Sequence, residues 1–110
     1  MQITTRSVND VIVADLVGDL DTQTSGPAGE ELGRIGKGGQ NKLLLNLEKV
    51  AFVSSAGLRI ILRTAKHLEA SGGKMKLCQV NGVVKEVMQI SGFATLLDLH
   101  EKEADALAAF

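Results

Sequence analysis

The sequence has no tryptophan and no tyrosine, and its only aromatic residues are three phenylalanines. Stacking platforms for nucleotide bases are therefore nearly absent, which argues against binding of single-stranded nucleic acid. The formal net charge of −1 gives no basic excess that would indicate a nucleic-acid partner. Cysteine occurs once, at Cys78, which excludes an intrachain disulfide and a CxxC metal site. We expect Cys78, within "KMKLCQV", to be a small buried hydrophobe in a strand.

Long hydrophobic runs are missing as well. No apolar stretch approaches the roughly 18 residues that a membrane span needs. The N-terminal "MQITTRSVND" has no apolar core of a signal peptide. We therefore expect a cytoplasmic protein with no membrane partner. The chain has 110 residues, of which 45% are hydrophobic and 23% charged, so we expect one globular domain over residues 1–110.

Motifs for nucleotides, metals and hydrolysis are absent too. The stretch "GRIGKGG" has no Ser or Thr after its Gly-Lys pair, and no GxGxxG occurs, so no phosphate-binding loop is predicted. Neither serine at 54 and 55 has the leading glycine of a GxSxG nucleophile elbow. His67 and His100 lack triad and metal-ligand spacing, and we expect both to be solvated. The sequence thus predicts no cofactor, no metal and no enzyme.

Apolar periodicity predicts strands that alternate with helices. Strands are expected at 2–6, 11–17, 43–47, 75–80 and 95–99, and "VAFV" at 50–53 either extends the third strand or starts another. A short, loosely held helix is expected through Ala28, Leu32 and Ile35, ended by "GKGGQN", and further helices at 82–90 and 101–109. This alternation after residue 40 predicts an α/β layered sheet with parallel pairs.

The longest predicted helix has one continuous apolar stripe. Its members are Leu58, Ile61, Leu62, Ala65 and Leu68. This helical spacing predicts that the stripe faces the core. Arg59, Arg63 and Lys66 form a basic edge beside the stripe, and "SGGK" ends the helix.

Two adjacent serines, Ser54 and Ser55, lie where this helix begins. The simplest interpretation is that one of them is an N-cap, because a serine oxygen accepts a bond from a free N–H of the first turn. A hydroxyl at this place is also a candidate acceptor for modification. A phosphate at a helix N-terminus is compatible with the fold and adds roughly −1.5 to −2 charges to the surface. Such a site would change binding and leave the domain folded.

These residues resemble a known family. The stretch "LLLNLEKVAFVSSAGLRIILRTAKHLEASGGKMKLCQV" is similar to the sulphate transporter and anti-sigma factor antagonist (STAS) domain, and above all to stand-alone bacterial anti-sigma factor antagonists. "VGDLDTQT" resembles the acidic loop of that family, and "MQISGFATLLDL" resembles its late helix-strand segment. Together the three matches cover nearly the whole chain in the right order. The resemblance implies a mixed β-sheet with helices packed mainly on one face.

The resemblance also implies a partner switch controlled by phosphorylation. In that family, the unmodified antagonist binds an anti-sigma factor that is also a serine kinase of the GHKL ATPase type. Phosphorylation dissociates the complex, and a PP2C-type phosphatase restores the antagonist. The implied acceptor is Ser55, with Ser54 as second choice. The implied partner-binding residues are Asp21, Thr22, Ser54, Ser55, Ala56, Gly57 and Arg59.

The chain departs from the family pattern at Ser54, where an aspartate is usual, and this leaves two candidate acceptors. Arg59, four residues after Ser55, either reaches a phosphate there or is an ordinary exposed helix residue. Two other functions stay open. The first is a structural STAS subunit of a lipid-transport or stressosome-like complex, which needs no phosphorylation. The second is a small α/β enzyme that uses Ser54 or Ser55, for which the sequence offers no base.

Overall fold

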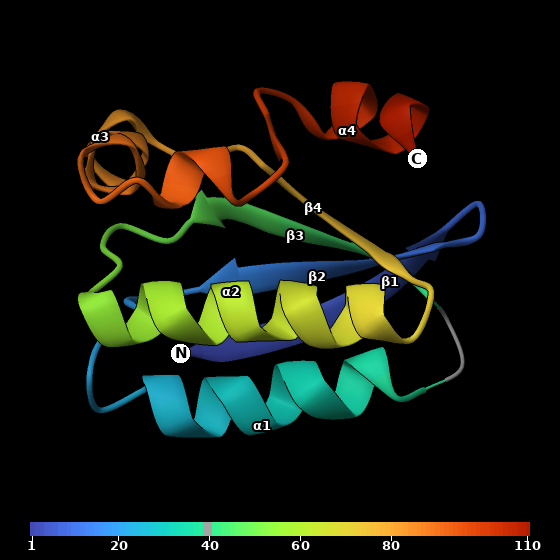
Figure 1. Cartoon of the computed structure of the whole chain (residues 1–110), viewed down its shortest axis with the longest axis horizontal. Helices are drawn as coiled ribbons and strands as arrows, with labels where there is room; N and C mark the ends of the chain where they lie inside the picture. Colours follow the sequence, from blue (N-terminus) through green and yellow to red (C-terminus); the bar gives the residue numbers. More distant parts are fainter. Residues whose placement is uncertain (39–40) are drawn as a thin grey trace.

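The computed structural model describes residues 1–38 and 41–110, and these form a five-stranded sheet (Figure 1). The strands lie in sequence order: β1 (Gln2–Val8), β2 (Val11–Val17), β3 (Lys42–Lys49), β4 (Lys74–Cys78) and β5 (Leu99–His100). β1 is antiparallel to β2, and each later neighbouring pair is parallel. The predicted mixed α/β sheet is confirmed.

The helices are α1 (Ser25–Gly36), α2 (Ser55–Ala70), α3 (Gly82–Ile90) and α4 (Glu103–Ala109), with a 3-10 turn, η1 (Phe93–Thr95), after α3. Each of α1, α2 and α3 connects two neighbouring parallel strands. Because such crossovers are right-handed and each new strand is added at the same edge, these three helices pack on one face. α4 follows the last strand and packs on the other face.

The main core lies between the sheet and helices α1 to α3. Three leucines of β3 point into it and are buried: Leu43, Leu45 and Leu47. Leu44 points to the opposite face, where it packs with Cys78 and Ala106. Since β3 is buried on both faces, its apolar run does not alternate with polar residues. Cys78 is fully buried, as predicted.

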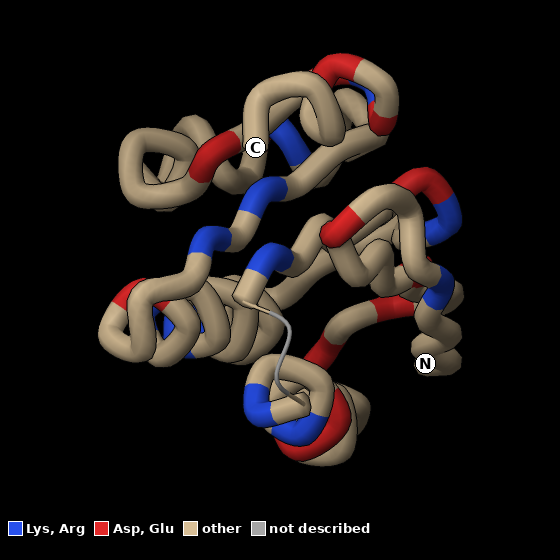
Figure 2. Tube along the Cα trace, turned by 90° about the vertical axis from the view of Figure 1, so that its right-hand side faces the viewer, with Lys and Arg blue, Asp and Glu red and all other residues tan. Residues whose placement is uncertain are grey.

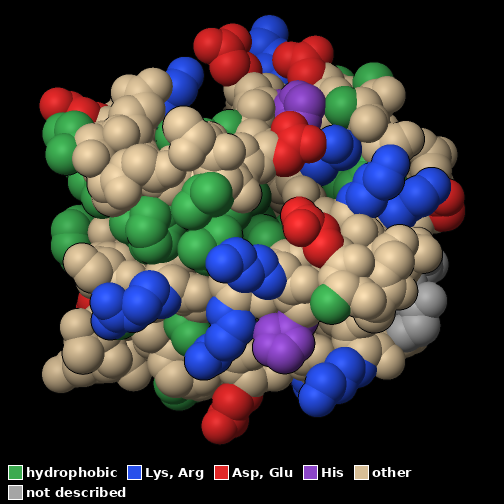
Figure 3. Space-filling view, viewed as in Figure 1, with side chains coloured by type: hydrophobic (Ala, Val, Ile, Leu, Met, Phe, Trp, Pro, Cys, Tyr) green, Lys and Arg blue, Asp and Glu red, His purple; other side chains and the backbone are tan. Residues whose placement is uncertain are grey.

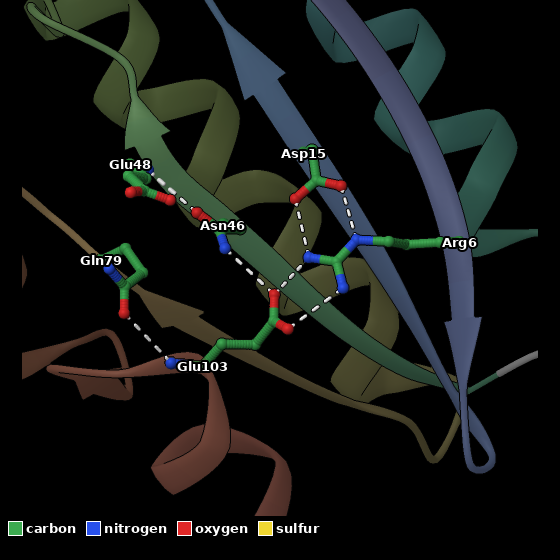
Figure 4. A network of polar contacts seen from close by, with 6 residues as sticks. All are labelled: Arg6, Asp15, Asn46, Glu48, Gln79 and Glu103. Carbon is green, nitrogen blue, oxygen red and sulfur yellow. Dashed lines mark hydrogen bonds and ion pairs between the residues drawn. The ribbon is translucent and has the colours of Figure 1, made fainter.

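A polar network fastens α4 to its face of the sheet (Figure 4). Arg6 of β1 donates two hydrogen bonds to the Asp15 carboxylate, at 2.7 and 3.0 Å, and also pairs with both carboxylate oxygens of Glu103 at the start of α4. Asn46 of β3 donates to Glu103 Oε1 at 3.0 Å, and the Glu103 backbone N–H donates to Gln79 Oε1 at 3.2 Å. The Glu103 carboxylate is therefore joined to β1 and β3 directly and to β2 through Arg6, and the Glu103 backbone is joined to the loop after β4.

Three sequence expectations need correction. α1 is not loosely held, because Ala28 and Leu32 are fully buried in the core. It ends at Gly36, and part of the predicted terminating stretch, 39–40, lies outside the described residues. The segment 50–53 neither extends β3 nor forms a strand, since Val53 makes only one parallel bridge, to Leu20. The last predicted helix, 101–109, begins two residues later, at Glu103.

The strand predicted at 95–99 is wrong over most of its length. The N–H groups of Thr95 and Leu96 bond back to the 3-10 turn, so they are not available to a sheet. Leu97 turns into the core while Leu96 stays 57% exposed. Only Leu99 and His100 reach the edge of β4, where the ladder has two residue pairs.

Within residues 1–38 and 41–110, no helix has the length and apolar character that crossing a membrane requires. Lys and Arg positions are interspersed with Asp and Glu positions along the trace (Figure 2).

Candidate functional site

Two loops that are far apart in sequence meet at the carboxyl edge of the parallel strands. Leu20, after β2, donates its N–H to Phe52 O at 2.9 Å, and its own carbonyl accepts from the Ser54 N–H at 2.9 Å. These bonds flank the bridge between Leu20 and Val53. The loop of Asp21 and the N-terminus of α2 are therefore held side by side.

This junction depends on Gly57 having no side chain. A Cβ at Gly57 would lie 2.6 Å from Leu20 O and 2.9 Å from Leu20 Cγ. Both distances are too short for real contacts, and the carbonyl oxygen belongs to backbone that is itself hydrogen-bonded. Gly57 thus lets the Leu20 loop approach the first turn of α2 directly.

The two serines have different roles in the structure. Ser54 is the N-cap of α2, and its Oγ accepts a hydrogen bond from the Gly57 N–H at 3.2 Å. Ser55 is the first helical residue and is exposed. Among the described residues, its hydroxyl has no hydrogen-bond partner. Ser54 therefore stabilises the helix, while the Ser55 hydroxyl is free to react.

Asp21 uses its carboxylate to hold its own loop. Oδ1 accepts from the N–H groups of Gln23 at 2.9 Å and Thr24 at 3.0 Å. These bonds, that of Thr24 first, lower the pKa of Asp21 below its usual range despite partial desolvation. The neighbouring Thr22 is exposed. Asp21 thus shapes this part of the surface, and Thr22 is the residue there that presents its side chain to solvent.

Sequence reasoning missed two groups that position the site. Thr24 Oγ1 donates to Asp19 O at 2.8 Å and accepts from the Asp21 N–H at 2.9 Å, so it closes the loop. Asn81 caps α3 through the Val84 N–H and donates to Val50 O at 2.9 Å, which ties α3 to the loop before α2. Asn before a helix signals a cap, but the bond to Val50 spans 31 residues and has no local signature.

Ala56 and Arg59 lie on the outer surface of α2, where they line a shallow, open groove. Arg59 is exposed and forms no ion pair with the described residues. Within the same part of the chain, no histidine or carboxylate hydrogen-bonds Ser54 or Ser55, and no cluster of three potential metal ligands occurs. The site therefore has an exposed hydroxyl but no positioned base beside it.

The histidines lie away from the serines. His67 is exposed on α2, as predicted. His100 is not solvated as expected: it is half-buried, and its Nε2 lies 2.8 Å from Asp98 Oδ1. β5 carries this side chain to the edge of β4, where Lys76 pairs with the same aspartate.

Comparison with known proteins supports the resemblance. BtrV of Bordetella bronchiseptica, which carries the name of an anti-sigma factor antagonist, is 31% identical over 110 residues, covering 100% of this chain and 95% of BtrV. A Thermotoga maritima crystal structure described as an anti-sigma factor antagonist superposes with a TM-score of 0.91 at 20% identity, covering 97% of this chain and 92% of the other.

The anti-sigma factor antagonist SpoIIAA of Bacillus shares the fold in two forms. Its unphosphorylated form gives a TM-score of 0.78 at 23% identity, covering 96% of this chain and 93% of the other. Its phosphorylated form gives 0.71 at 22% identity, covering 98% of each chain. The model of the STAS domain matches residues 2–106. Sequence pattern, fold and comparison agree, and the chain belongs to the STAS domain family.

Proposed function

We propose that this protein is a cytoplasmic anti-sigma factor antagonist that is switched by phosphorylation of Ser55. The observation that carries the proposal is that the two serine hydroxyls differ in exposure and in hydrogen bonding. Ser55 is exposed and has a free hydroxyl, whereas the Ser54 hydroxyl is engaged as the cap of α2. The names of BtrV and SpoIIAA support the antagonist role, and the existence of a phosphorylated form of SpoIIAA supports the switch.

The partner in this proposal is an anti-sigma factor that is also a serine kinase of the GHKL ATPase type. It would contact the surface formed by Asp21, Thr22 and Ser54–Gly57, with Arg59 at its border. The Leu20 bonds hold this surface in one shape before the partner arrives. Binding to a preformed surface avoids the entropic cost of ordering a loop. A PP2C-type phosphatase would reverse the modification.

A phosphate on Ser55 changes the surface and leaves the fold intact. It would lie beside the free N–H groups and positive dipole end of α2, where an anion is favourable. It would also add roughly −1.5 to −2 charges and considerable bulk to the contact surface. A docked partner would lose its hydrogen bonds there and face an unpaired charge, so the complex would dissociate.

The proposal is tested by incubating the protein with the kinase and Mg-ATP and locating phosphate by fragmentation mass spectrometry. We expect one phosphate, on Ser55, in the wild type and in Ser54→Ala, and none in Ser55→Ala. Ser54→Ala is the matched control, and it should lose about 1 kcal/mol of stability because it removes the cap. Phosphate on Ser54 alone would show that the acceptor assignment is wrong.

Binding supplies the second test. Ser55→Asp should remain folded and lose affinity for the kinase, while Ser55→Ala should bind and stay bound in the presence of ATP. Equal affinity of Ser55→Asp and the wild type would refute the charge mechanism. Absence of phosphate on protein from its native cells, under all growth conditions, would favour the structural subunit of a larger complex.

A further inference from the structure

The outer face of α2 has a row of cations that the fold itself does not use. Arg59, Arg63 and Lys66 are exposed and, within the described residues, none of them forms an ion pair. Arg6, Arg34, Lys42 and Lys76 pair with carboxylates, whereas five lysines elsewhere are also exposed without an ion pair among the described residues. The row differs from those lysines because it places three cations within about two turns of one helix. The row therefore adds uncompensated positive charge to a chain whose net charge is −1.

Apolar surface lies beside the row. Leu62 of the same helix is half-buried and lines the same open groove as the three cations. Val83 and Ile90 of α3 and Leu96 after η1 are also exposed, at 63, 80 and 57%. Figure 3 shows hydrophobic side chains gathered between α2 and α3, bordered by Lys and Arg side chains along α2. A patch of this kind, apolar with a charged rim, is typical of a protein interaction site.

The close packing of α1 and α2 fixes one member of the row. A Cβ at Gly29 of α1 would lie 3.2 Å from Arg63 Nη2, so the guanidinium rests over the seam between the two helices. Arg63 is thereby held at the α1 side of α2, where its side chain remains exposed. Arg59 and Lys66 lie seven residues apart, which corresponds to about 10 Å along the helix axis. A docking segment of two to three helical turns would match this length.

We propose that Arg59, Arg63 and Lys66, together with Leu62 beside them, form a docking surface for an acidic amphipathic segment of a partner protein. Asp and Glu side chains of that segment would pair with the three cations, and its apolar side chains would cover Leu62. The inference rests on the proposed function, since the same partner would contact Ser55 one turn before Arg59. Three cations are fewer than the four to eight that mark an acidic lipid surface.

This surface also explains how modification of Ser55 would act beyond its own contacts. Residues at i and i+4 on a helix are neighbours, so a phosphate on Ser55 would attract the Arg59 guanidinium. Arg59 would then pair with the phosphate and no longer with the acidic segment of the partner. The phosphate would repel that segment at the Ser55 end of the docking surface.

The test measures binding of the purified GHKL-type anti-sigma factor kinase to the wild type and variants at 50 and 300 mM NaCl. We expect Lys66→Glu and Arg63→Glu each to weaken binding about tenfold at low salt and to flatten its salt dependence, because like charges would face each other. Lys102→Glu is the matched control: Lys102 is exposed before α4, and its side chain makes no capping bond. It should bind as the wild type does.

The outcomes separate the two proposals. If the wild type binds, Ser55→Asp does not, and both α2 variants keep wild-type affinity at both salts, the docking surface is wrong and the switch stands. If the wild type does not bind the kinase, both are overturned. If Arg63→Glu disturbs the packing of α1 on α2, its loss of binding is not informative, and Lys66→Glu alone then tests the docking surface. A wild-type dimer in light scattering that Lys66→Glu dissolves would make a second copy the occupant and overturn the inference.

Discussion

Replacing Gly57 with alanine should destabilise the protein, although alanine is the better helix former. The added Cβ would lie 2.6 Å from the Leu20 carbonyl oxygen, a backbone atom that cannot rotate away. Overpacking of this kind costs about 1–3 kcal/mol. Displacing Leu20 also weakens the bond from Ser54, worth about 1 kcal/mol. The gain in helix propensity returns at most about 1 kcal/mol.

The net loss expected for Gly57→Ala is therefore about 2 kcal/mol in the free energy of unfolding. For a chain of this size, the loss corresponds to a fall in Tm of about 8 °C. Urea denaturation followed by circular dichroism measures the first quantity, and calorimetry the second. Gly33→Ala is the matched control, because a Cβ at Gly33 of α1 would meet nothing within 4 Å.

Gly33→Ala should leave stability unchanged or raise it by up to about 1 kcal/mol. The specific result is that the free energy of unfolding falls for Gly57→Ala and is unchanged or rises for Gly33→Ala. If Gly57→Ala proved as stable as the wild type, the Leu20 loop could not be packed on the first turn of α2 as described. The preformed partner surface argued from that contact would then lose its basis.

Three further predictions concern the opposite face and the loops. Glu103→Gln should cost about 1–2 kcal/mol at pH 7, since hydrogen bonds with Arg6 are charge-assisted. Those bonds lower the pKa of Glu103, so the stability they add is present above about pH 4.3 and lost as the pH falls below it. Urea titrations should therefore show a smaller difference from the wild type at pH 3 than at pH 7, because the contribution is lost as the pH falls towards the lowered pKa of the folded state, and a constant difference would contradict this reasoning. Burial raises the pKa of Cys78 to about 12, so iodoacetamide at pH 8 should not alkylate the native protein but should modify it fully in urea, as mass spectrometry would show. Asn81→Ala should lose about 1–2 kcal/mol, through the cap of α3 and the bond to Val50, and a loss below 0.5 kcal/mol in urea denaturation would show that these bonds contribute little.

Local patterns predicted most of the elements. The spacing of the predicted apolar stripe indicates α2 because a helix repeats every 3.6 residues. Four of its five members are buried, whereas Leu62 is only half-buried, at the edge of the stripe. The segment 82–90 was predicted with the bounds that α3 has. The strand predicted at 95–99 failed because the same apolar residues fit a turn that inserts Leu97 into the core.

The tight packing of α1 could not be predicted from its local sequence either. Four glycines in α1, at 26, 29, 33 and 36, suggest a weak helix when propensity alone is considered. In the structure, the absence of a side chain at Gly29 lets Ile60 of α2 approach closely, since a Cβ would lie 2.8 Å from its Cδ1. Packing against α2 and the sheet thus outweighs the low propensity.

The sequence by itself determined the α/β alternation, the helix that begins at the two serines and the family to which these motifs belong. It did so because periodicity, caps and motifs are local properties of a chain. Only the tertiary structure decided which serine is free, because the long-range bond from the Ser54 N–H to Leu20 O holds Ser54 ahead of the helix, where its hydroxyl caps the Gly57 N–H. It alone showed that the Leu20 loop meets α2 and that Glu103 ties α4 to β1 and β3. These contacts join residues that are far apart in the chain, and their geometry exists only once the parallel strands have brought the loops to one edge.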